Sequence, residues 1–65
     1  MTMQIGRIYD AVAKDIAHRG TDSRQAIVGA MTAYCLALKA SGRKVPLWSE
    51  SGLLKGVHAR LEGRI

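Results

Sequence analysis

Residues 23–40 read SRQAIVGAMTAYCLALKA, and this stretch decides the fold. Apolar residues recur in it at helical spacing and form a central stripe of Ile27, Met31, Tyr34 and Leu38. Val28 and Cys35 widen the stripe on one side, and a row of alanines widens it on the other. Seen along the helix axis, the apolar residues cover more than half of the circumference of the helix. A helix that lies on the surface of a protein needs a narrower apolar stripe. We therefore predict a helix over 23–40, capped by Asp22 with Gln25, that is central in the fold or packs against a second copy.

Before this stretch, the chain shows a second helical pattern over residues 3–19. Its apolar positions share one face and are Ile5, Ile8, Tyr9, Val12 and Ile16. Gly20 follows the last turn and suits the left-handed position just beyond a helix. Residues 2–6 also alternate as a short strand would, so strand and helix both remain open for residues 2–8.

After the central stretch, the segment 41–46 is short and basic, and Pro46 prevents the helix from continuing. A third helix is predicted over 50–64, with Ser49 as its N-cap and Trp48 stapled onto Leu53. Gly52 and Gly56 lie one turn apart in this helix. They indicate either the close approach of another backbone or glycines that are merely tolerated.

These patterns predict an all-α fold, a small three-helix domain over 1–65 with a possible short N-terminal strand. A chain of 65 residues has room for one small core. The residues expected to form it are Ile8, Val12, Ile16, Ile27, Met31, Tyr34, Leu38, Leu54, Val57 and Leu61.

The composition argues against catalysis and against several kinds of site. The chain has one cysteine, so no disulfide can form within it, and its cysteine and histidines have no metal-ligand spacing. No nucleophile and base share a motif, and no glycine pattern matches a phosphate loop. We therefore expect a non-enzymatic protein with no cofactor and no metal. The longest uncharged run, 25–38, is too short to cross a membrane. No signal peptide is evident, and we expect a cytoplasmic protein.

One part of the chain resembles a known family. The run 16–27, which reads IAHRGTDSRQAI, is followed by Ala30, Met31 and Tyr34. It resembles the helix–turn–helix part of ribbon-helix-helix DNA-binding proteins, in which the first helix ends near a glycine and a Ser-Arg pair opens the second. The resemblance covers residues 2–40. It implies a dimer whose N-terminal strand enters the DNA major groove, with Thr2 and Gln4 facing outward.

Two functions are compatible with these features and with a net charge of +5. The first is a small adaptor or inhibitor, of the type found in phages and plasmids, that binds an acidic surface of a protein partner. The second is a dimeric basic regulator that binds duplex DNA, whose phosphates would suit the basic residues. The expected partner-binding residues are Arg43, Lys44, Trp48, Arg60 and Arg64. A homo-oligomer is expected through Ala26, Ala30, Ala33 and Ala37.

Overall fold

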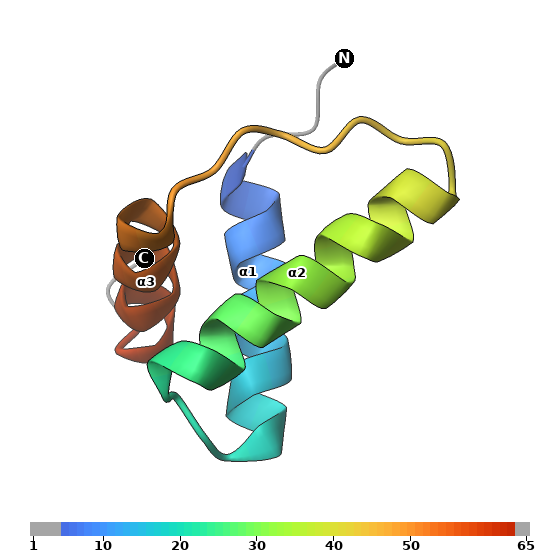
Figure 1. Cartoon of the computed structure of the whole chain (residues 1–65). Coiled ribbons are helices and arrows are strands. Elements are labelled where there is room, and N and C mark those ends of the chain that lie inside the picture. The colour runs from blue at the N-terminus through green and yellow to red at the C-terminus, as the bar shows by residue number, and fades with distance from the viewer. Residues whose placement is uncertain (1–4, 64–65) are drawn as a thin grey trace.

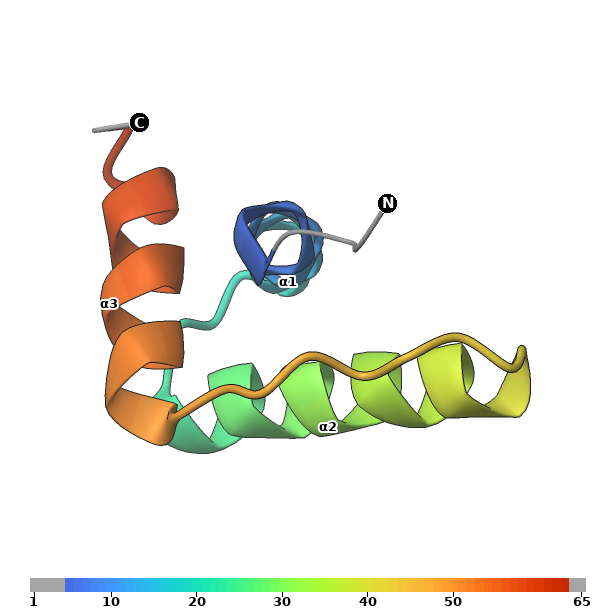
Figure 2. The same ribbon diagram turned by 90° about the horizontal axis from the view of Figure 1, so that it is seen from above.

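The computed structural model describes residues 5–63 and contains three helices, α1 (Ile5–Arg19), α2 (Arg24–Ala40) and α3 (Glu50–Leu61). Seen from above, α2 and α3 form the two arms of an L, and α1 lies in the angle between them (Figure 2). All three helices contact one another. The predicted all-α, three-helix fold is therefore confirmed.

The helix ends follow local chemistry. The N-cap of α2 is Ser23, whose hydroxyl oxygen accepts a hydrogen bond from the Ala26 amide, so the prediction of Asp22 as the cap is wrong by one residue. Ser49 caps α3 as predicted, accepting from the Gly52 amide. An N-cap side chain of this kind satisfies one of the amides that the first turn leaves without a helical partner.

Glycines with positive φ end the first two helices. Gly20 has φ 75°, as predicted, and its amide donates to the Ile16 carbonyl at 3.0 Å. Gly42 has φ 77°, and the amide after it donates to the Leu38 carbonyl at 2.9 Å. Both arrangements are αL-type helix terminations, which turn the chain sharply away from the helix axis.

The structure shows no strand in residues 5–63. Ile5 and Gly6, the end of the candidate N-terminal strand, belong to the first turn of α1. Thr2 and Gln4, which would face outward from that strand, lie outside the described residues. The helical periodicity of α1 therefore extends to the first residue that the structure describes. The third helix ends at Leu61 rather than at residue 64.

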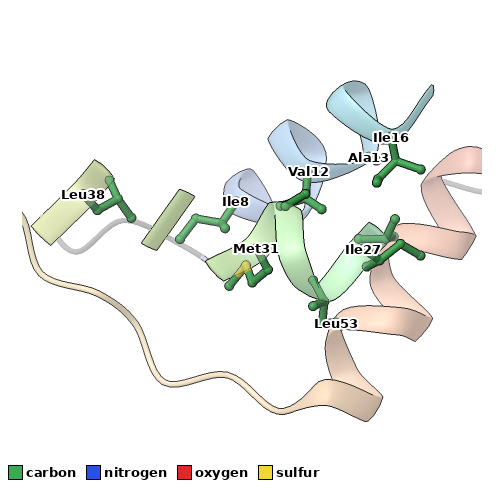
Figure 3. Close-up of a cluster of buried hydrophobic side chains, with 10 residues drawn as sticks. Ile8, Val12, Ala13, Ile16, Ile27, Met31, Leu38 and Leu53 are labelled. Atoms are coloured by element: carbon green, nitrogen blue, oxygen red, sulfur yellow. The ribbon is translucent and has the colours of Figure 1, made fainter. Parts of the chain in front are cut away.

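The core lies where the three helices meet (Figure 3). Its buried residues are Ile8, Val12, Ala13, Ile16, Ile27, Ala30, Met31, Leu38, Leu53 and Val57. Tyr34, Leu54 and Leu61 were expected in the core but are only half-buried, packing against its edge. Leu53 takes the fully buried place in α3 instead, because the helix turns Leu53 and Val57 inward together.

The contact between α1 and α3 depends on Gly56. A Cβ atom at this position would lie 2.4 Å from Cδ2 of Tyr9, closer than any real contact. The Tyr9 ring thus occupies the space that a side chain at residue 56 would need. Neither interpretation of the glycines holds at Gly56: the group that lies close is the Tyr9 side chain of α1 rather than another backbone, and the position leaves no room for a side chain.

Candidate protein-binding groove

The segment that joins α2 to α3, residues 41–49, lies beside α2. It leaves the C-terminal end of α2 and returns in an extended path towards the other end, where α3 begins (Figures 1 and 2). Residues 44–48 form no backbone hydrogen bond with another backbone group in the described part of the chain. We call residues 41–49 the linker.

A groove of about 480 Å³ lies between α2 and the linker. Its lining consists of Thr32, Cys35, Leu36, Lys39, Val45 and Trp48. Trp48 is half-buried, because one side of it packs against the core. Thr32 donates its hydroxyl to the Val28 carbonyl at 2.9 Å, which satisfies the donor within its own helix. The groove is therefore lined mainly by apolar groups. We call it the α2–linker groove.

Two of the three large exposed apolar side chains in residues 5–63 line this groove. Leu36 is 62% exposed and Val45 39% exposed, and both line it. Leu47 lies in the same linker and is 99% exposed. Single exposed apolar residues are common, but a cluster around a concave surface is typical of an interaction site.

Basic residues border the apolar surface. Between residues 23 and 49 the chain has no acidic residue, and its basic residues there are Arg24, Lys39, Arg43 and Lys44. Arg24 forms an ion pair with Glu50 at the start of α3. Lys39, Arg43 and Lys44 are exposed, and no ion pair involves them within residues 5–63. Lys39 lines the groove, and Arg43 and Lys44 follow it in the linker. We call these three residues the basic rim, and their charge suits an acidic contact surface.

Cys35 lies in the groove beside Trp48. Partial burial raises the pKa of its thiol, and the hydrogen bond with the Trp48 side chain opposes that shift. A raised pKa leaves less thiolate near neutral pH, and thiolate is the reactive form. The structure thus describes Cys35 as a weakly reactive thiol.

We expect alkylation of Cys35 by iodoacetamide to show a higher apparent pKa in the folded protein than in urea. Desolvation of the thiol in the folded state is the reason. The rate of alkylation as a function of pH measures both values, and the signal is unambiguous because Cys35 is the only cysteine. An apparent pKa in the folded protein at or below the value in urea would contradict the description of Cys35 as a desolvated, weakly reactive thiol.

Of the five predicted partner-binding residues, Trp48 lines the groove. Arg43 and Lys44 are exposed in the linker, next to Val45 in the chain. Arg60 sits elsewhere, packed against α1, and Arg64 lies outside the described residues. Leu36, Val45 and Leu47 were missed by the sequence analysis. A large apolar residue on the face of α2 opposite the core stripe, as Leu36 is, was the available signal.

Arg60 is engaged within the protein. Its guanidinium pairs with Asp10 of α1, donates from Nη1 to the Gly56 carbonyl at 2.9 Å, and lies 5.6 Å from the centre of the Tyr9 ring. Its side chain is 17% exposed. These contacts join α1 to α3 and leave little of the guanidinium for an external partner.

Replacing Arg60 with Gln is therefore expected to lower the free energy of unfolding by about 1 kcal/mol. The estimate reflects lost charge-assisted hydrogen bonds, reduced because Asp10 is well exposed. Arg43→Gln serves as the control, since the Arg43 side chain is exposed. Urea denaturation of both variants measures the difference. Equal stabilities would show that the Arg60 contacts contribute nothing.

The alanine row predicted as an oligomer interface does not lie on one free surface. Ala30 is 7% exposed and belongs to the core, and Ala26 is half-buried against it. Ala33 and Ala37 are exposed. The core of one protomer therefore already covers half of the row, and only Ala33 and Ala37 are exposed.

The described residues contain no cluster of histidine, cysteine and carboxylate groups that could hold a metal ion. None of the helices in residues 5–63 has both the length and the apolar character needed to cross a membrane.

Comparison of the chain with known protein families, with curated proteins and with solved structures found no match in any of the three.

Proposed function

We propose that this protein is a non-enzymatic adaptor or inhibitor that binds a protein partner through the α2–linker groove. The observation that supports this most is the coincidence of exposed Leu36 and Val45 with a groove that Trp48 lines. Tryptophan and arginine carry binding energy more often than other residue types; Trp48 lines the groove, and Arg43 lies in the linker. The partner contributes apolar side chains to the groove.

The charge of the groove selects the partner surface. Within residues 5–63 no ion pair involves Lys39, Arg43 or Lys44, so in this proposal the partner supplies carboxylates. Complementary charge speeds association and rejects basic surfaces. The proposal places this binding in the cytoplasm, where a reducing environment keeps Cys35 a free thiol.

A homo-oligomer is part of the proposal. A domain of this size has a small core, and association with a second copy would add buried surface. The accessible alanines, Ala33 and Ala37, are exposed on α2 and provide a small-residue contact for that association.

The test uses tagged protein in its native host, with a groove variant and a matched surface variant. The groove variant is Leu36→Glu with Arg43→Glu and Lys44→Glu. The surface variant is Lys14→Glu with Lys55→Glu, which changes charge on exposed positions of α1 and α3. We expect one stoichiometric protein to bind the wild type and the surface variant and to be lost from the groove variant, with circular dichroism showing that all are helical.

Two outcomes would overturn the proposal. Retention of the partner by the groove variant would place the contact elsewhere. Loss of the partner after nuclease treatment, with affinity for duplex DNA that falls steeply with salt, would favour the DNA-binding regulator of ribbon-helix-helix type.

A further inference from the structure

We infer that this protein forms an antiparallel homodimer in which the exposed face of α2 packs against the same face of a second copy. This inference rests on one part of the proposed function, the homo-oligomer, and assigns its interface and its symmetry. Three observations carry it: the exposed face of α2 lacks charge along most of its length, its large and small residues match under a twofold axis, and the two ends of α2 differ in charge.

The exposed face of α2 is unusual for a helix that borders solvent. Between Arg24 and Lys39 every exposed residue of this helix is uncharged, and these residues are Gln25, Gly29, Thr32, Ala33, Leu36 and Ala37. Within residues 5–63, no other helix lies on the side of α2 that faces away from α1 (Figure 2). A surface helix typically carries charged side chains on the face opposite the core. The exposed face of α2 therefore resembles a contact surface more than a solvated one.

Large and small residues on this face are placed so that two copies fit together. Gly29 and Leu36 lie about two turns apart on one side of the helix. Leu36 is 62% exposed, and a Cβ atom at Gly29 would meet nothing within 4 Å. In an antiparallel pair whose twofold axis passes between Thr32 and Ala33, Leu36 of each copy lies over Gly29 of the other. Each leucine then fills the space that the missing side chain leaves, which is how ridges of one helix pack into grooves of another.

The charges at the two ends of α2 favour the antiparallel order. Lys39, followed by Arg43 and Lys44, makes the C-terminal end basic, whereas Arg24 at the N-terminal end pairs with Glu50. A parallel pair would bring the two basic ends together, and like charges in contact oppose association. An antiparallel pair instead places the basic end of one copy near the end of the other copy that carries Glu50.

The interface is small, because each copy contributes one helix face. Interfaces of this kind lie at the low end of the specific range, so we expect a Kd above about 1 µM. Leu36 also lines the α2–linker groove, whereas Gly29 does not. Gly29 is therefore the position at which the dimer can be tested while the lining of the groove stays unchanged.

Sedimentation equilibrium of the purified protein, at concentrations up to about 1 mM, measures the dimer without any other partner. We expect a reversible equilibrium between monomer and dimer. Gly29→Leu places two leucines where one fits, and Leu36→Ala removes the leucine, so each should raise Kd about tenfold. Combining them exchanges the large and the small residue, and the double variant should dimerise more tightly than either single variant. Ala17→Leu adds the same side chain at an exposed position of α1 and should leave Kd unchanged.

Three results would count against the inference, provided that circular dichroism shows every variant to be helical. A wild type that stays monomeric would overturn the dimer. Gly29→Leu with the Kd of the wild type would place the interface elsewhere. A double variant no tighter than either single variant would overturn the antiparallel register. Binding at the groove is judged separately, because Gly29→Leu should still capture the protein partner from the host as the wild type does.

Discussion

Leu53→Ala is expected to unfold most of the protein at 25 °C. Leu53 is fully buried where α3 meets the other two helices, and it is drawn in the core cluster of Figure 3. Truncating a buried leucine costs about 2–5 kcal/mol, and a domain of this size rarely has more than about 3–5 kcal/mol of stability. Loss of the helical circular dichroism signal, or a large shift of the urea midpoint, measures the effect.

The matched control is Leu47→Ala. This leucine is 99% exposed, so its truncation is expected to change the free energy of unfolding by less than about 0.5 kcal/mol. Similar destabilisation by both substitutions would show that α3 does not pack as described.

Gly56→Ala is expected to destabilise the protein by about 1–3 kcal/mol, although alanine is the better helix former. The new Cβ would meet Cδ2 of Tyr9 at 2.4 Å and Cε2 at 2.8 Å. Because the contact involves a ring packed between α1 and α3, the two helices have to move apart. Thermal denaturation of the variant measures the loss.

Gly29→Ala is the control for helix propensity, and its expected effect has the opposite sign. Gly29 is an exposed position of α2, and a Cβ there meets nothing within 4 Å. The substitution should stabilise the protein by about 0.5–1 kcal/mol. In a Tyr9→Ala background the penalty of Gly56→Ala should disappear, as a double-mutant cycle shows. A penalty that persists without the Tyr9 ring would refute the steric explanation.

The groove illustrates what a sequence pattern leaves open. Arg43, Lys44 and Trp48 were assigned to a binding surface because they are close in the chain; in the structure Trp48 lines the groove, and Arg43 and Lys44 are exposed in the linker. Arg60 was assigned to the same surface by its residue type, yet its carboxylate partner is Asp10, which lies fifty positions earlier in the chain. Nothing in the local sequence of α3 indicates that pairing.

The sequence alone determined the number of helices and most of their ends. Ser49, Gly20 and Pro46 act on backbone groups only a few residues away, so their effects can be read without the fold. The apolar periodicity of α1 and α2 likewise identified most of the buried residues, because one face of each helix carries nearly all of its large apolar side chains.

Only the tertiary structure decided how each helix is rotated about its own axis and which side chains stay exposed. Leu53 and Leu54 are adjacent in α3, and the structure buries the first and half-exposes the second, with the Tyr9 ring of α1 packed against Gly56 of the same helix. The burial of Ala30 and the path of the linker beside Leu36 likewise result from contacts between helices and not from the local sequence. Each depends on contacts between segments distant in the chain, and these are set by the packing of all three helices together rather than by local preference.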